Sequence, residues 1–420
     1  MKSKKIWIIN HYAMAPSQGG LSRHFYFSKY LAQKGDTVRI FTSSAIHNTD
    51  VNMIKPEEKT LFKESEVDGQ IFTYIKSSQY KGNGLGRIKN MLGFAFSLKK
   101  IKKAYGSEKP DVIYTSSPDL FTAYYAEKLA KKMKVPCVVE IRDLWPLSIV
   151  EYKNISPKNP IIVALYMLEK KIYKRADAIV FTMPGGKDYI KDKKWEKAVS
   201  ASKIFNVNNG IDAESQKSDL KNYEYHDIDL DDKKSFKVVY TGSIREVNNL
   251  SALLDCAKLL KDDNVKFILF GDGSQRAELE KRAADENISN VVFKGYVDKK
   301  YIPSVCSKAD VNFINVKPTG VSKYGVSWNK LFDYMNAEKP VLSNVKVNYD
   351  FIEKYSCGIA CEKQDAQTVK DAILQIKNLP EDEYGKMCRN AKQGAKDFDF
   401  KSLTEKFDEV LNYAILNRKK

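Results

Sequence analysis

Two pairs of charged residues are spaced so that each pair could act on one ligand. Arg142 and Asp143 open the segment RDLWP directly after an apolar run, where packing poorly explains two charges. Asp143 could orient or deprotonate a hydroxyl group and Arg142 could hold a phosphate; the alternative is an internal ion pair. Lys330 and Asp333 are three residues apart in a segment that predicts a helix, so they share one helix face. That face could contact one ligand or carry an exposed salt bridge.

Glycine-containing loops follow three of the predicted strands. Gly19 and Gly20 would allow a ligand to approach the backbone, and the helix after them offers free N–H groups and its positive dipole end; a plain turn explains the pair equally well. The segments YTG and FGDG place Gly242, Gly271 and Gly273 at two further strand ends. The first loop is not GxGxxG, and no acidic residue is suitably placed after the second strand, so a dinucleotide site is not expected.

Two further loops could contribute to phosphate binding. Arg245 follows the first strand of the second half, where it could reach a diphosphate or be an ordinary surface arginine. Ser327 could cap the predicted helix that contains Asn329 and Lys330. The free N–H groups at the start of that helix would then face an anion.

These loops lie in two series of short apolar strands that alternate with helices. The first series has strands near 5–10, 38–43, 112–116, 136–141 and 178–182, and the second begins at Phe236. Such alternation indicates parallel sheets covered on both faces, so the fold class is α/β with two Rossmann-like domains. Residues 213–235 are polar and lack a sustained period, which favours a surface linker or an irregular insertion. An amphipathic helix over 400–417 is expected to return to the first domain.

The positive charge of the chain is concentrated in its first half. The 420 residues carry a net charge of +17, with 35 basic and 19 acidic residues in 1–200 and 35 basic and 34 acidic residues in 201–420. The asymmetry favours contact with a polyanion or an anionic membrane, although a lysine-rich, solvated surface is an equal alternative. Residues 86–105 combine an apolar stripe with many lysines, which is typical of a helix in a membrane interface. An ordinary helix that covers the sheet is the alternative.

Several classes of protein and site are not expected. The longest apolar runs are shorter than the ~18 residues of a membrane-spanning helix, and the short run after the N-terminal lysines does not suit a signal peptide, which predicts an intracellular protein. None of the six cysteines forms a CxxC pair, so we expect buried free thiols and neither disulfides nor a zinc site. The predicted strands lack a basic motif interleaved with aromatic residues, so nucleic-acid binding is not expected.

Taken in order, these motifs resemble the family-4 retaining glycosyltransferases of the GT-B fold. The resemblance covers nearly the whole chain: the Gly-Gly loop, NVNNGID over 206–212, YTG, FGDG, GYV, and LFDYMNAEKPVL. The combination of IRDLWP with SWNKLFDYM looks like the branch that transfers amino sugars in bacterial surface-polysaccharide assembly, such as capsule, O-antigen or exopolysaccharide. The resemblance implies two domains facing across a cleft. Residues 1–205, with the returning helix 400–420, would bind the acceptor, and residues 206–399 would bind the nucleotide sugar.

The resemblance also implies a set of roles. A UDP-sugar would donate its sugar with retention of configuration and without a metal or other cofactor, and Asp333 would bind the ribose. The backbone near Tyr296 and Val297 would read the base. The acceptor would be a polyprenyl-diphosphate-linked glycan at the inner face of the cell membrane, where the basic half, including 86–105, would associate peripherally.

Two departures from the family pattern alter these roles. The first carboxylate of the family's usual pair is replaced by Gly325, and the arginine expected directly after Gly242 is replaced by Ser243. Arg245 and Lys330 are therefore assigned to the β-phosphate, with the loops at Gly19, Gly20 and Ser327. The departures keep open a catalytically inactive, glycosyltransferase-like scaffold, and a UDP-sugar 2-epimerase of the same fold is a further alternative.

Overall fold

The computed structural model describes residues 3–20, 22–47, 49–80, 82, 84–116, 119–317 and 319–418, so Lys419 and Lys420 of the returning segment lie outside it. The chain divides into two compact units. The first unit contains residues 1–208 and 400–420, and the second contains residues 209–399. The boundary falls after Asn208, three residues beyond the position expected from the sequence.

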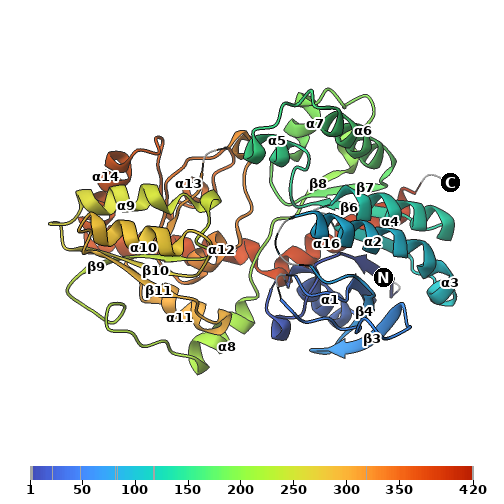
Figure 1. The fold of residues 1–420 in the computed structure, drawn as a ribbon, viewed down its shortest axis with the longest axis horizontal. Helices are drawn as coiled ribbons and strands as arrows, with labels where there is room; N and C mark the ends of the chain where they lie inside the picture. Colours follow the sequence, from blue (N-terminus) through green and yellow to red (C-terminus); the bar gives the residue numbers. More distant parts are fainter. Residues whose placement is uncertain are drawn as a thin grey trace. The chain divides into compact units, whose positions relative to one another are not determined.

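The first unit contains an eight-stranded sheet in the order β3-β4-β2-β1-β5-β6-β7-β8. Figure 1 labels β3, β4, β6, β7 and β8 of this sheet. All neighbouring strands are parallel except β3 and β4, which form a hairpin through Asp68 and Gly69, both with positive φ. The strands are β1 (Lys5–Ile9), β2 (Thr37–Ser43), β3 (Phe62–Val67), β4 (Gln70–Ile75), β5 (Val112–Ser116), β6 (Cys137–Ile141), β7 (Ala178–Phe181) and β8 (Ile204–Asn206).

Helices cover both faces of this sheet. They are α1 (Arg23–Gln33), α2 (Leu85–Ser97), α3 (Ile101–Tyr105), α4 (Leu120–Met133), α5 (Leu147–Lys153), α6 (Pro160–Arg175), α7 (Gly186–Asp192) and α16 (Phe400–Leu416). Successive strand residues point to opposite faces, so Ile6 and Ile8 pack toward α1 and α16, in a cluster that excludes Trp7. Helix α4 packs on β5 and β6 and lies between α2 and α6.

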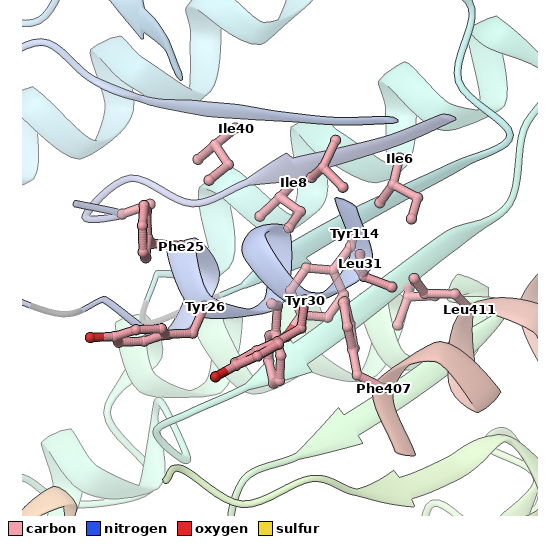
Figure 2. Packing of buried hydrophobic residues seen from close by; sticks show 14 of the residues in the cluster. Ile6, Ile8, Phe25, Tyr26, Tyr30, Leu31, Ile40, Tyr114, Phe407 and Leu411 are labelled. Atoms are coloured by element: carbon pink, nitrogen blue, oxygen red, sulfur yellow. The ribbon is translucent and has the colours of Figure 1, made fainter. Parts of the chain in front are cut away.

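The last helix completes the core of the first unit. Phe407 of α16 stacks on Phe27 of α1 with ring centroids 4.5 Å apart and meets Tyr114 of β5 edge-on at 4.6 Å. Figure 2 shows Phe407 and Leu411 pointing into this cluster beside Tyr114 and Leu31. The prediction that the C-terminal helix returns to the first domain is confirmed.

The second unit contains a fully parallel six-stranded sheet in the order β11-β10-β9-β12-β13-β14. Its strands are β9 (Phe236–Thr241), β10 (Val265–Phe270), β11 (Val291–Gly295), β12 (Val311–Ile314), β13 (Val341–Ser343) and β14 (Gly358–Ala360). Its helices are α8 (Ala213–Asn222), α9 (Leu250–Leu259), α10 (Arg276–Asp285), α11 (Ile302–Ser307), α12 (Asn329–Asn336), α13 (Phe351–Lys354), α14 (Ala366–Lys377) and α15 (Glu381–Ala395). The predicted α/β class with two parallel-sheet domains is confirmed.

Two local predictions are wrong in part. The segment 213–235 is not irregular throughout, because Asp212 caps α8 by accepting a hydrogen bond from the Ser215 N–H, and α8 follows. The segment 86–105 is not one helix, since a short 3₁₀ turn over 98–100 separates α2 from α3. The apolar stripe of that segment is largely buried in the protein, at Met91, Ala95, Leu98 and Ile101. For these residues the alternative, a helix that covers the sheet, is correct.

Candidate functional site

Lys330 of α12 carries an amino group that is shielded from solvent. Its ammonium nitrogen lies 4.1 Å from the centre of the Tyr240 ring, is shielded from solvent, and has no hydrogen-bond partner in the described part of the chain. A Cβ atom on Gly242 would lie 2.9 Å from this nitrogen, so glycine at 242 leaves the ammonium its space. Burial lowers the pKa of Lys330 to about 7. Within the described residues, no counter-ion lies beside this amino group.

A buried hydroxyl group fixes α12 beside the end of β9. The Tyr334 hydroxyl accepts a hydrogen bond from the Thr241 N–H at 2.8 Å and donates to the Thr241 carbonyl oxygen at 3.2 Å. Leu331, Phe332 and Met335 are buried around it and anchor the inner face of the helix. Because Lys330 lies one turn before Tyr334, this anchor holds its side chain over Tyr240. Tyr334 was not among the residues predicted from the sequence, although a tyrosine directly after Asp333 was a visible signal.

Backbone hydrogen bonds connect the carboxyl-terminal ends of β9, β10 and β11 and the loops that follow them. The Gly242 N–H donates to the Phe270 carbonyl oxygen at 2.9 Å, and the Gly271 N–H donates to the Gly295 carbonyl oxygen at 2.7 Å. A Cβ atom on Gly271 would lie 1.7 Å from the Gly242 oxygen, and one on Gly273 would lie 2.2 Å from the Ile244 oxygen. Packing between the loops therefore requires glycine at 271 and 273, whether or not a ligand also approaches.

Arg245 is exposed at the start of the short turn 246–248, beyond the end of β9. The loop below it is held firmly: Asn248 donates to the carbonyl and hydroxyl oxygens of Ser243 at 2.7 and 3.0 Å. Asn315 in turn donates to the Asn248 and Asn249 carbonyl oxygens at 2.8 and 2.6 Å. A long, exposed guanidinium on a fixed loop can reach a ligand above the strand ends.

Asp333 faces a different neighbour from Lys330. Its Oδ1 atom accepts a hydrogen bond from Gln216 of α8 at 2.6 Å, and Gln216 Oε1 accepts one from Asn336 at 2.5 Å. Burial raises the pKa of the Asp333 carboxyl group. Within the described residues, the Lys330 amino group has no hydrogen-bond partner, so the alternative of an exposed salt bridge between Lys330 and Asp333 is wrong. The spacing of three residues places them on the same helix but does not bring their charged groups together.

The segment before α12 differs from its prediction. Ser327 does not cap the helix, because α12 begins at Asn329 with Trp328 at the N-cap position. The Ser327 hydroxyl instead accepts a hydrogen bond from the Asn209 N–H at 2.7 Å, while Asn209 Nδ2 donates to the Ser327 carbonyl oxygen at 2.8 Å. Gly325 has φ +78°, which disfavours any residue with a side chain. A carboxylate at 325 would therefore require a different backbone.

Two aromatic and apolar positions follow β11. The side chain of Tyr296 is 75% exposed directly after the strand, whereas Val297 packs against the small cluster that contains Phe270 and Val305. A tyrosine ring exposed at the end of a parallel strand offers a flat surface, and the backbone beside it is anchored by Val297. This is the place where the resemblance puts the base.

Packing against a neighbouring side chain accounts for the glycine at position 20 but not for the glycine at position 19. Gly19 has φ +66° with open space around its Cα atom, whereas a Cβ atom on Gly20 would lie 2.8 Å from the Met14 sulfur. Helix α1 begins only at Arg23, and its first side chains, Arg23 and His24, are buried. The pair therefore forms a turn in front of the helix, with Gly19 the more exposed to a ligand.

A buried carboxylate organises the residues around this turn. Glu140 of β6 is fully buried and bonded by Arg23 Nε at 2.8 Å and by the Ser116 hydroxyl at 2.6 Å. The nearby guanidinium of Arg23, with His24, holds the pKa of Glu140 well below its usual range despite burial. Arg23 Nη2 also donates to the Val207 carbonyl oxygen at 2.8 Å. Glu140 was not predicted from the sequence, although an acid inside the apolar strand CVVEI was a usable signal.

Arg142 and Asp143 follow directly after β6. Arg142 is half-buried, within electrostatic reach of Glu140 and Arg23. Asp143 is exposed, and its Oδ1 atom accepts a hydrogen bond from the Ser148 hydroxyl at 3.4 Å. The two charged groups therefore stand at the edge of the buried Glu140 cluster, with Asp143 open to an incoming hydroxyl group.

Three further expectations concern the cysteines, a metal site and a membrane-spanning helix. Within them, five cysteines are buried and Cys388 is half-buried, and all six are free, as predicted. No group of three or more His, Cys, Asp or Glu side chains in these ranges is placed to hold a metal ion. No helix in them is long and apolar enough to cross a membrane.

Two family models match successive parts of the chain. The model described as Glycosyltransferase Family 4 matches residues 18–215, and the model described as Glycosyl transferases group 1 matches residues 223–398. The poly(ribitol-phosphate) alpha-N-acetylglucosaminyltransferase of Staphylococcus aureus (strain COL) is 29% identical over 135 residues, 31% of this chain and 26% of the relative. The putative colanic acid biosynthesis glycosyl transferase WcaI of Escherichia coli (strain K12) is 28% identical over 87 residues, 21% of each chain. The aligned segments thus span about a quarter or less of these relatives.

Solved structures resemble nearly the whole chain. Sucrose-phosphate synthase from Thermosynechococcus elongatus has a TM-score of 0.71 at 17% identity, with 97% of this chain and 98% of that chain covered. The alpha,alpha-trehalose 6-phosphate synthase of Burkholderia multivorans has 0.71 at 12% identity, with 98% of each chain covered. Anabaena HepE in complex with UDP-glucose has 0.63 at 16% identity, with 97% and 99% covered. The chain is therefore built from a Glycosyltransferase Family 4 domain followed by a Glycosyl transferases group 1 domain, the domain pair of a GT-B glycosyltransferase.

Proposed function

We propose that the chain is a retaining glycosyltransferase that moves an N-acetylated amino sugar from a UDP-sugar to a polyprenyl-diphosphate-linked glycan. It would act at the cytoplasmic face of the membrane in surface-polysaccharide assembly. The observation that carries the proposal is the unpaired, shielded ammonium group of Lys330, at the strand ends of a group 1 domain. A buried cation without a counter-ion is costly unless an anionic ligand completes the site.

The leaving diphosphate of the donor suits this cation. When the bond between the sugar and the diphosphate breaks, negative charge grows on the β-phosphate, and a donor placed there in advance stabilises it. Lys330 and Arg245 supply the positive charge, and Gly242 keeps space beside the ammonium. Loss of one such donor typically costs about 3–4 kcal/mol in the transition state. Uridine diphosphate is supported as the carrier by HepE, whose solved complexes hold UDP and UDP-glucose.

The remaining donor contacts follow from the same strand ends. Tyr296 presents an exposed ring toward a base, and Asp333, held by Gln216, is available to ribose hydroxyl groups through its second oxygen. The acceptor hydroxyl attacks on the face from which the diphosphate leaves, and the departing phosphate takes its proton, which retains the configuration. This chain's own residues bind and orient the substrates, and no step requires a metal.

Asp143 and Arg142 are the proposed contacts to the acceptor. The exposed Asp143 carboxylate can orient a hydroxyl group, and the Arg142 guanidinium can hold a phosphate. The Staphylococcus aureus relative is named for transfer to poly(ribitol-phosphate), so a second candidate acceptor is a polyol-phosphate polymer. Both acceptors are anionic, which suits the basic first half of the chain.

A donor and acceptor panel tests the proposal. The purified protein is incubated with UDP- and GDP-sugars, with polyprenyl-diphosphate-GlcNAc in anionic vesicles or with poly(ribitol phosphate), and nucleoside diphosphate release is followed. Release that requires one donor and the lipid acceptor supports the proposal, and release with the polymer alone moves the acceptor to the second class. Lys330→Met and Arg245→Ala should lose turnover, while Lys261→Met, an exposed lysine of the same domain, should not. A sugar that changes without an acceptor indicates an epimerase, and vesicle binding without donor consumption indicates a scaffold.

A further inference from the structure

Helices α2, α4 and α6 form the outer layer on one face of the first unit's sheet, and this layer exposes no carboxylate in its described residues. Helix α2 contains no acidic residue, and the acids of α4 and α6, Glu127 and Glu169, are buried. Exposed lysines and arginines are found on all three helices and on the short turns after α2. They include Lys89, Lys99, Lys128, Lys131, Lys170 and Lys171. A layer with this charge is complementary to an anionic surface.

Aromatic rings and lysines alternate across this layer. Lys99 lies 4.8 Å from the centre of the Phe96 ring and 5.0 Å from that of Tyr125, and the two rings are 5.1 Å apart. Lys128 lies 4.3 Å from the centre of the Tyr124 ring, and Lys171 lies 5.6 Å from it. The contacts run from α2 across α4 to α6. Aromatic side chains beside lysines are typical of the interface between a bilayer and water.

The first half of α6 carries apolar side chains that are exposed to solvent. Ile162 and Ile172 are buried on the inner face, whereas Ile161 is 71% and Met167 63% exposed on the outer face, with Val163 beside them. The outer face is thus apolar at the start of the helix and basic at its end, where Lys170 and Lys171 follow. An apolar end for insertion next to a basic end for headgroups is the pattern of an interfacial helix.

We infer that the outer layer of α2, α4 and α6 is the surface that contacts an anionic membrane, with Ile161 and Met167 of α6 inserted into the interface. The inference rests on the proposed function for its membrane-bound acceptor, and it replaces the predicted stripe of 86–105, whose core residues are buried. The occupant is a lipid surface because the layer joins net positive charge to interfacial aromatic residues.

Vesicle binding tests the surface directly. The full-length protein is sedimented with phosphatidylcholine vesicles, with or without phosphatidylglycerol, over a range of salt concentrations. Wild type should bind only the anionic vesicles. The Ile161→Gln/Met167→Gln variant should bind them about tenfold or more weakly. The Lys128→Gln/Lys171→Gln variant should lose about fivefold per lysine and show a weaker dependence on salt.

Matched controls separate this surface from others. Ile228→Gln removes an even more exposed apolar side chain, in the second unit, and should bind like wild type. Leu85→Gln/Ile88→Gln tests the exposed start of α2, and binding lost in that variant alone would overturn the role of α6. Unchanged binding of the α6 variant, or no binding by wild type, also overturns the inference. A concentration-dependent mass in light scattering that the α6 variant abolishes would assign the surface to a second copy.

Activity on a water-soluble acceptor analogue with a short lipid distinguishes the inference from the proposed function. If the α6 variant keeps wild-type turnover on this analogue and loses turnover on vesicle-borne acceptor, both stand. If no acceptor is used but vesicle binding still depends on α6, the proposed function fails and the surface stands.

Discussion

The unpaired ammonium of Lys330 predicts that binding of UDP takes up a proton. Burial lowers its pKa from 10.5 to about 7, a difference of about 3.5, and 1.36 kcal/mol per pKa unit makes the charged form costly by about 5 kcal/mol. A diphosphate beside the ammonium favours the charged form and raises the pKa again. In the free protein, about one-tenth of the Lys330 amino groups are protonated at pH 8. Binding of UDP should therefore take up about 0.9 proton per protein at pH 8 and about 0.1 proton at pH 6.

Titration calorimetry with UDP at pH 8 measures this uptake. The phosphates of UDP are almost fully ionised at that pH. The binding enthalpy is compared in Tris and phosphate buffers, whose ionisation enthalpies differ, and the slope gives the number of protons. The affinity should also fall, approaching tenfold per pH unit well above pH 7, because deprotonated Lys330 must first be charged. Equal enthalpies in both buffers at pH 8 would refute the assignment of Lys330 to the diphosphate.

Two variants isolate the contribution of this residue. Lys330→Arg keeps a charge at every accessible pH and should bind UDP without proton uptake, if its larger head fits beside Gly242. Lys330→Met should bind more weakly by about 100-fold, with no proton uptake and a flat pH dependence. Lys261→Met, which changes an exposed lysine, should match wild type. Wild-type affinity in Lys330→Met would contradict the reasoning as directly as the calorimetric result.

Three further predictions concern stability. Burial raises the pKa of Glu169 from 4.5 to about 8, so between these pH values the folded state holds a proton that the unfolded state releases, and the fold is destabilised as the pH rises. The Glu169→Gln variant should therefore exceed wild type by about 3 kcal/mol in free energy of unfolding at pH 7 and by little at pH 5. Urea titrations at the two pH values measure this difference. Tyr334→Phe leaves the Thr241 N–H unpaired and should cost about 1–3 kcal/mol and raise KM for the donor; unchanged stability and KM would disprove the anchor. Gly271→Ala places a Cβ atom 1.7 Å from a backbone oxygen and should lower Tm severely. Gly93→Ala, in open space on α2, should be neutral or slightly stabilising. Equal Tm values for the two variants would contradict this prediction.

The fold was predictable because its signals are local and repeated. Apolar strands that alternate with helices specify parallel sheets, and the stripe with Leu403, Phe407 and Leu411 specifies a helix that needs a partner core. The hairpin of β3 and β4 was not predicted, since β3 is mostly polar and only Asp68-Gly69 marks the turn. Short-range patterns therefore gave the architecture but not every strand.

The candidate site was harder to predict because its geometry depends on contacts that are distant in sequence. The spacing of Lys330 and Asp333 placed both on α12, but their surroundings are set by Tyr240 and by Gln216, roughly 90 and 120 residues away. Ser327 looked like a cap, yet its hydroxyl oxygen accepts a hydrogen bond from the Asn209 N–H. Sequence spacing fixes which residues share an element, while tertiary packing decides what each side chain meets.

The backbone connections among the loops after β9, β10 and β11 have a consequence for how this domain can evolve. Each loop is bonded to the next through Gly242, Gly271 and Gly295, so an insertion in one would displace its neighbours as well. New donor preferences should therefore arise by exchange of side chains that project from this lattice, such as Arg245 and Tyr296, rather than by changes in loop length. Libraries that vary these two positions should yield folded proteins far more often than libraries that lengthen the loops.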